Sequence, residues 1–260
     1  MAKLVFLGTA AAGFVGSKRQ RSAVYFDGLL LDCGADVIGR LEDLKLAGNL
    51  VAILITHLHY DHYGGLFSLL VNLAIKEDVK IKMGAKTKKP KLTIYAPGGL
   101  NTILEAIKVT GKVYDFVFDR LDLKFIEVNT SLNFEEAGKK IKPILMDHGK
   151  TVDFGYLIET NGFKLFYGGD SSFPSNVQNI RADYLIHEAT FQNKYVDAAK
   201  ASGHSTAEQA AEAATKCGAK KLFLTHVTNV IVPESELELE AKRVFANTVL
   251  PNDMQSFELD

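Results

Sequence analysis

Short apolar runs alternate with amphipathic stretches along the whole chain. The apolar runs predict β-strands over residues 3–8, 22–26, 29–32, 51–55, 92–96, 123–128, 141–146, 154–160, 163–167, 182–186, 220–224 and 256–259. The amphipathic stretches predict helices over residues 34–46, 63–75, 99–109, 206–217 and 234–246. Because no Pro-rich or low-complexity segment separates these elements, the pattern predicts one domain over residues 1–260.

Two of the predicted strand pairs resemble each other. Each pair is joined by a dipeptide that favours the positive φ angles of a type I′ turn, Asp27-Gly28 in the first and Asn161-Gly162 in the second. Each hairpin then enters a loop of glycine and an acid, Asp32-Cys33-Gly34 and Gly168-Gly169-Asp170. The repetition predicts two related halves whose loops meet at one rim.

Local signals also mark the ends of two elements. Ser205 and Glu208 form the pattern of a capping box at the start of the helix over 206–217, and Gly218 is a typical C-cap. Lys3 and the apolar run after it admit a secretory leader. Gly8 and Thr9 break that run after four residues, which favours a strand entering a loop.

Composition limits the class of protein. With 47% apolar residues, the 260-residue chain can bury a large core, and its net charge of −1 lacks the overall positive charge of a dedicated nucleic-acid binder. Cys33 and Cys217 are too few for a disulfide scaffold and lack metal-type spacing, which indicates a reducing compartment and predicts a cytoplasmic location. No apolar run approaches the roughly twenty residues of a membrane span, so we expect no membrane partner.

The histidines carry the candidate chemistry. Three of the seven lie in one run, Thr56-His57-Leu58-His59-Tyr60-Asp61-His62, directly after the buried strand over 51–55. Imidazole and carboxylate groups are ligands of zinc and neighbouring divalent metals. The first two histidines can turn toward one ion, and the acid and third histidine, past the bend, toward a second. Gly64 and Gly65 let the backbone enter the next helix without a side-chain clash.

The H-x-H-x-D-H run resembles the signature of the metallo-β-lactamase superfamily. Further segments along the chain match the same family, namely Leu31-Asp32-Cys33-Gly34, His148, Gly168-Gly169-Asp170 and Thr225-His226. The resemblance implies an α/β fold, the four-layer αββα sandwich, with two metals at one rim. It also implies a homodimer.

Carried over residue by residue, the resemblance implies two metal sites. The first would be held by His57, His59 and His148, the second by Asp61, His62 and His226, with Asp170 bridging both. Two Zn²⁺ ions are the expected cofactors, and Mn²⁺, Fe²⁺ or Co²⁺ also suit such ligands. A hydroxide bridging two such ions can attack phosphorus at neutral pH, and Asp61 is a candidate to orient it.

Two more motifs resemble the ribonuclease Z branch of this superfamily, His187-Glu188-Ala189-Thr190 and Gly203-His204-Ser205-Thr206. A histidine beside a helix N-terminus suits a phosphate, so we expect His204 to contact the phosphate oxygens or protonate the leaving alcohol. Glu188 is expected to hold His204. Ser205, Arg21 and Lys18 are candidate contacts for the substrate phosphates.

Two features bear on the size of the substrate. The segment from Lys76 to Lys91 has a local excess of lysine, which predicts either a nucleic-acid contact or a mobile charged loop. Many ribonuclease Z members carry a long Gly/Pro-rich arm between the equivalents of His148 and Asp170, and here that interval is a plain hairpin. The arm favours tRNA, so its absence weighs against a tRNA substrate.

These observations predict a dinuclear, ribonuclease Z-like phosphodiesterase that acts on RNA or on a small nucleotide. A small cyclic-nucleotide phosphodiesterase is one alternative. A carboxylic ester, thioester or lactone hydrolase on the same metals is another. A metal-dependent binding module on an inherited fold is the non-catalytic alternative, and the retention of every ligand position argues against it.

Overall fold

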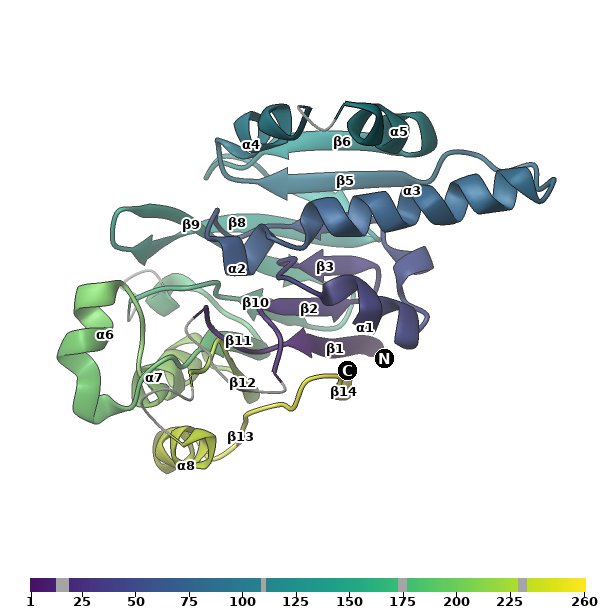
Figure 1. Ribbon diagram of the computed structural model, residues 1–260. Coiled ribbons are helices and arrows are strands. Elements are labelled where there is room, and N and C mark those ends of the chain that lie inside the picture. The colour runs from purple at the N-terminus through teal and green to yellow at the C-terminus, as the bar shows by residue number, and fades with distance from the viewer. Residues whose placement is uncertain (13–18, 109–110, 173–176, 229–232) are drawn as a thin grey trace.

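The computed structural model describes residues 1–12, 19–108, 111–172, 177–228 and 233–260. Within these residues the strands form two seven-stranded sheets that pack face to face (Figure 1). The first sheet has the order β14-β1-β2-β3-β4-β5-β6, from strands Ser256–Leu259, Ala2–Gly8, Ala23–Phe26, Leu29–Leu31, Ala52–Leu54, Lys91–Ala96 and Asp122–Glu127. The second has the order β13-β12-β11-β10-β9-β8-β7, from Thr248–Val249, Lys221–Thr225, Tyr184–Glu188, Lys164–Tyr167, Thr151–Glu159, Lys139–His148 and Phe134–Glu136.

Helices cover the outer face of each sheet. On the first sheet lie α1 (Val37–Asp43), α3 (Leu66–Lys82), α4 (Leu100–Ile107) and α5 (Lys112–Arg120), and on the second lie α7 (Ala207–Cys217) and α8 (Glu234–Val244). The short helices α2 (Tyr60–Tyr63) and α6 (Val196–Ser202) lie near one end of the sandwich (Figure 1). Short 3₁₀ turns occupy Ala47–Asn49, Val177–Asn179 and Asn193–Tyr195.

The core has three layers, which confirms the predicted αββα sandwich. Between the sheets, Phe6 and Phe26 pack with side chains such as Phe223 from the opposite sheet. The outer face of the first sheet packs on α1, α3, α4 and α5, and that of the second on α7 and α8. Cys33 and Cys217 are buried and unpaired. No helix among the described residues is both long and apolar enough to cross a membrane.

The two sheets repeat one topology. In each, an antiparallel hairpin (β2–β3 or β9–β10) is followed by parallel strands, as the predicted duplication requires. Asp27 and Gly28 have φ angles of 41° and 89°, in agreement with the predicted turn. The type I′ prediction is wrong for the second hairpin, since neither Asn161 nor Gly162 has a positive φ. There Thr160 closes a wider loop by donating its N–H to the carbonyl of Phe163.

The predicted end of the helix over 63–75 is wrong, because α3 continues to Lys82. Asp78 pairs with Lys82 at 2.7 Å and with Arg120 at 2.9 Å, so these contacts support the added turns. The first part of the lysine-rich segment is therefore helical rather than a loop. Helix α3 starts beside α2 and spans about 25 Å. Its lysines therefore lie at the end far from the signature loop, by which we mean residues 56–62 (Figure 1). The sequence patterns also did not predict α2, α5, α6, β7 and β13.

The predicted cap of α7 is off by one residue. Thr206, not Ser205, is the N-cap: its hydroxyl accepts from the N–H of Gln209, and the Gln209 side chain accepts from the N–H of Thr206. Gly218 ends the helix in the left-handed conformation, as predicted. Thr206 and Gln209 have the same spacing as Ser205 and Glu208, so the capping-box pattern alone does not separate the two pairs.

We predict that Thr206→Ala lowers the free energy of unfolding by about 1 kcal/mol, because it leaves an N-terminal N–H of α7 without its acceptor. Glu208→Ala is the matched control. If Ser205 and Glu208 formed the capping box, this substitution would lower the free energy of unfolding by a similar amount. Urea unfolding followed by circular dichroism measures both. An equal loss in the two variants would contradict the observed cap.

Candidate metal centre

The signature loop follows β4, a strand whose residues are all buried. Its backbone turns into α3 through Gly65, where a Cβ atom would lie 2.1 Å from the carbonyl oxygen of Gly34. Only glycine permits this approach, as the sequence predicted. Thr56, the first residue of the loop, donates its N–H to the buried carboxylate of Asp32 at 2.8 Å. The loop is therefore fixed to the end of β3 next to it.

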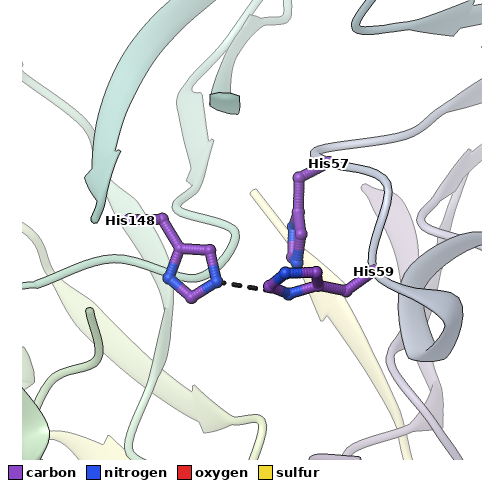
Figure 2. Close-up of side chains that lie close together, drawn as sticks. All are labelled: His57, His59 and His148. Atoms are coloured by element: carbon purple, nitrogen blue, oxygen red, sulfur yellow. Dashed lines mark hydrogen bonds between the residues drawn. The ribbon is translucent and has the colours of Figure 1, made fainter. Parts of the chain in front are cut away.

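Three imidazoles meet at one point of the rim (Figure 2). His57 and His59 come from the signature loop, and His148 reaches them from the end of β8 in the other sheet. Nε2 of His148 lies 3.3 Å from Nδ1 of His59. The ligand atoms of the three lie within 4.8 Å of one another. This is the set that the sequence assigns to the first metal.

A second group gathers beside it. Nε2 of His226 lies 3.3 Å from Oδ2 of Asp61, and Nε2 of His62 lies 3.6 Å from the same oxygen. The carboxylate of Asp170 lies between the two groups: its Oδ2 is 3.1 Å from His226, 3.3 Å from His62 and 3.9 Å from His57. All seven predicted ligands thus converge at one rim.

The arrangement fits divalent cations. Two ligand atoms about 2.1 Å from one tetrahedral ion are about 3.4 Å apart, close to the spacings within each group. Nε2 of His57, Nε2 of His62 and Oδ1 of Asp170 are buried without a hydrogen-bond partner. Such groups are costly unless something bonds them, and imidazole and carboxylate donors are those that zinc and its neighbours accept.

Carboxylates fix the orientation of two of these histidines. Nδ1 of His57 lies 2.7 Å from Oδ2 of Asp153, and Nδ1 of His62 lies 2.8 Å from Oδ2 of Asp32. A carboxylate accepts, so Nδ1 donates in each case and Nε2 is the nitrogen that faces the metal site. Gly169, just before Asp170, has a φ of 61°, and a Cβ there would lie 2.6 Å from the Asp153 carboxylate, so this position requires glycine.

Neutral groups orient two others in the same way. Nδ1 of His148 donates to the carbonyl of Gly203 at 2.7 Å. Nδ1 of His226 lies 3.0 Å from the hydroxyl of Thr190, which donates to Oε2 of Glu188 at 2.7 Å and so accepts from the imidazole. His226 holds a φ of 52°, a conformation rare outside glycine and often found at functional sites. Both histidines therefore also present Nε2.

The electrostatics suit ligation. Burial, together with the neighbouring imidazole of His62, lowers the pKa of His57, so this histidine is neutral as a ligand must be. Burial alone would raise the pKa of Asp170, but the neighbouring His226 and His62 lower it well below its usual value. Asp170 is therefore an anion placed between the two groups. Burial would lower the pKa of His62, but the charges of Asp170 and Asp32 raise it well above its usual value, so a metal bound here would displace a proton from His62.

His204 and Glu188 form a pair beside the metal centre. Nδ1 of His204 lies 2.9 Å from Oε1 of Glu188, which also accepts from the N–H of Ser171 at 2.8 Å. Burial would lower the pKa of His204, but the charge and hydrogen bond of Glu188, with a contribution from Asp170, raise it to about 9. In the structure His204 is thus a cation at neutral pH, held as the sequence predicted.

A cavity of about 350 Å³ opens onto this centre. Its lining divides into the titratable residues of the centre, which we call the floor, and small or apolar residues, which we call the wall. The floor residues are His59, Asp61, Asp170, His204 and His226, and the wall residues are Ala11, Ala12, Thr190, Phe191, Ser202 and Thr228. Ser205 lies beneath it, fully buried, and donates its hydroxyl to the carbonyl of Ser171. Arg21 donates to the carbonyl of Ala11 at the edge, and Lys18 is outside the described residues. Substrate contacts by these last three residues stay predictions.

The sequence does not indicate the role of three residues that support the centre. Asp153 lies near the start of β9, where one acid in a strand gives no local signal. Thr190 belongs to the motif that contains Glu188, but the motif does not show that it orients His226. Asp32 lies in a segment that carries the family resemblance, but its position alone does not show that it orients His62. Sequence spacing identified the ligands, whereas these supports depend on which strands pair.

Known proteins resemble this chain over nearly its whole length. The model of the β-lactamase superfamily domain matches residues 28–227. A ribonuclease Z of Archaeoglobus fulgidus is 31% identical, and the match covers 99% of this chain and 97% of the relative. The crystal structure of the short form of human tRNase Z superposes with a TM-score of 0.74 and 28% identity, covering 99% of both chains.

A further solved structure supports the fold. The metallo-β-lactamase fold protein YhfI from Bacillus subtilis superposes with a TM-score of 0.78 at 24% identity, covering 99% of this chain and 100% of that one. This identity bears on architecture alone. Together with the family match and the rim of histidines and acids, these comparisons establish that the chain belongs to the metallo-β-lactamase superfamily of metal-dependent hydrolases, on the ribonuclease Z branch.

Proposed function

We propose that this protein is a dinuclear metal-dependent phosphodiesterase of the ribonuclease Z type, which cleaves phosphodiester bonds in RNA. The observation that carries the proposal is the His204–Glu188 pair, with Nδ1 and Oε1 2.9 Å apart, at a cavity whose floor is the metal centre. An ester or lactone needs only the metals, whereas a phosphodiester also has non-attacked anionic oxygens. A histidine cation beside those oxygens favours the phosphodiester.

Each group has a distinct task in this proposal. His57, His59 and His148 would hold one Zn²⁺, Asp61, His62 and His226 would hold the other, and Asp170 would lie against both. When bound, such a pair of cations supplies a nucleophile at neutral pH and stabilises the charge that grows on the phosphate. Asp61 orients the attacking water, and His204 stabilises a phosphate oxygen or gives its proton to the leaving alcohol. Glu188 keeps His204 protonated and fixed.

Within phosphodiesterases, the size of the substrate is the open choice. Strands β8 and β9 are joined at the rim by Gly149 and Lys150 alone, so no arm extends there. The alignment with the Archaeoglobus relative spans 310 positions against 260 residues in this chain, so about fifty of its positions have no counterpart here. This shortening favours a small nucleotide as the second candidate. The His204 and Glu188 motifs favour RNA, and we retain RNA first.

Other parts of the proposal concern the setting of the enzyme. The two unpaired cysteines agree with a cytoplasmic location. A homodimer follows from the resemblance. The lysines near the end of α3 and in the segment after it remain a candidate nucleic-acid contact. Mn²⁺, Fe²⁺ or Co²⁺ in place of Zn²⁺ would suit the same ligands.

We predict that zinc-loaded protein hydrolyses bis(p-nitrophenyl) phosphate and that His204→Ala lowers this turnover about 10²–10⁴-fold, because an acid or phosphate contact is lost. Ser202→Ala, on the wall of the same cavity, is the matched control and should change turnover less than about twofold. Cyclic nucleotides and a precursor tRNA in the same panel separate the two substrate classes. Turnover of thioesters or lactones alone would refute the phosphodiesterase.

We predict that Glu188→Gln moves the alkaline limb of the pH–rate profile to lower pH. The Glu188 carboxylate raises the pKa of His204, and the protonated form that acts is lost as pH rises through that pKa. Removing the charge lowers the pKa, so activity is lost earlier on the alkaline side. The profile of kcat/KM between pH 5 and 10 measures the shift, with zinc content determined in both proteins. An unmoved limb would rule out His204 as the titrating group.

We predict that Asp153→Asn weakens zinc binding about tenfold or more, because an amide oxygen is a weaker acceptor than a carboxylate for Nδ1 of His57 and orients that ligand less firmly. Competition with a chromophoric chelator measures the affinity without any substrate. Asp183→Asn is the matched control: Asp183 pairs with Lys220 on the second sheet and contacts none of the ligands. Equal affinities in all three proteins would show that Asp153 has no part in the metal centre.

A further inference from the structure

The cavity beside the metal centre has one aromatic wall. Among the described residues that line it, Phe191 carries the one phenyl ring. Its backbone is fixed on both sides: its N–H donates to the carbonyl of Ser205 at 3.3 Å, and its carbonyl accepts from the N–H of Ala207 at 2.9 Å. These two bonds fix Phe191 beside the start of α7, next to His204.

Phe191 is placed to present a face to a ligand. Its side chain is half-buried, and its ring centroid lies 6.3 Å from that of His204, with the planes 48° apart. The other described wall residues are small and uncharged, namely Ala11, Ala12, Thr190, Ser202 and Thr228, and no described lysine or arginine lines the cavity. Charge is thus confined to the floor, and a group held against Phe191 is held by apolar and stacking contacts.

The volume of the cavity suits a small ligand. A cavity of about 350 Å³ is near the lower end of the range of about 300–1,000 Å³ typical of small-molecule sites. A base within a duplex is already stacked on both faces and cannot lie against a protein ring. An unpaired base can, and stacking on an aromatic side chain tolerates any of the four bases because each has a π-face.

We propose that Phe191 is the stacking surface for the base of the nucleotide that adjoins the scissile phosphate. It makes the site selective for unpaired, single-stranded nucleotides with little preference among bases. This rests on the proposed phosphodiesterase function and adds its specificity-determining residue. The phosphate lies on the floor beside His204 and the metal centre, and the base lies between Phe191 and the small residues on the other walls.

Binding of UMP and of ribose 5-phosphate to the zinc-loaded protein tests the proposal, because the two ligands differ only in the base. We expect Phe191→Ala to weaken UMP binding about tenfold or more and to leave ribose 5-phosphate within about twofold. Phe191→Tyr keeps a ring and should keep UMP binding. Phe116→Ala is the matched control: Phe116 is also a half-buried phenylalanine, it lies on α5 and does not line the cavity, so its loss should change neither affinity.

Several results would overturn the proposal. Equal weakening of both ligands by Phe191→Ala would mean that the ring only supports His204. UMP binding no tighter than ribose 5-phosphate in the wild type, or no binding of either, would mean that no base is stacked there. Turnover of bis(p-nitrophenyl) phosphate is a separate readout. If the protein does not hydrolyse bis(p-nitrophenyl) phosphate but binds UMP in a way that depends on Phe191, the proposed phosphodiesterase function is refuted and the base subsite is supported.

Discussion

One buried carboxylate, that of Asp32, joins the two sheets where the metal centre lies. It accepts hydrogen bonds from the N–H of Thr56, from Nδ1 of His62 and from the hydroxyl of Tyr167. Asp32 follows β3 in the first sheet and Tyr167 ends β10 in the second, so these bonds fix the two ends relative to each other. An isolated buried carboxylate costs several kcal/mol, and it is tolerated here because donors from both sheets surround it.

The same arrangement occurs at two more places on the rim. Asp153 lies behind His57, and Glu188 lies behind His204 and, through the hydroxyl of Thr190, behind His226. Each acid sets the direction of an imidazole from the side away from the cavity. The ligand directions therefore depend on which strand ends meet, since the supporting acids follow β3, lie within β9 and end β11. A bound cation would bond the buried inward atoms that have no hydrogen-bond partner.

The sequence predicted the features that depend on local spacing. The signature loop, His148 at the end of a strand and Asp170 after a Gly-Gly pair all lie at strand ends, and the alternation of strands and helices places strand ends at a common rim. It could not predict Asp153, because a single acid inside a strand has many structural uses. It also misplaced the N-cap of α7, where Ser205 and Thr206 offer two equivalent boxes, and the end of α3, where Asp78 stabilises turns that the apolar pattern does not require.

The short β8–β9 connection changes how such a site can distinguish its substrates. An arm far from the metals would bind a folded RNA by its shape, and the described residues offer none at this rim. Discrimination then depends on groups within reach of the scissile phosphate. In the proposed function the floor would bind any phosphodiester, because anionic oxygens are common to all of them. The wall would then carry the difference between one leaving group and another. In the described part of the cavity that wall has one phenyl ring, Phe191, among small residues, and the proposed stacking on this ring would select for a flat, unpaired base.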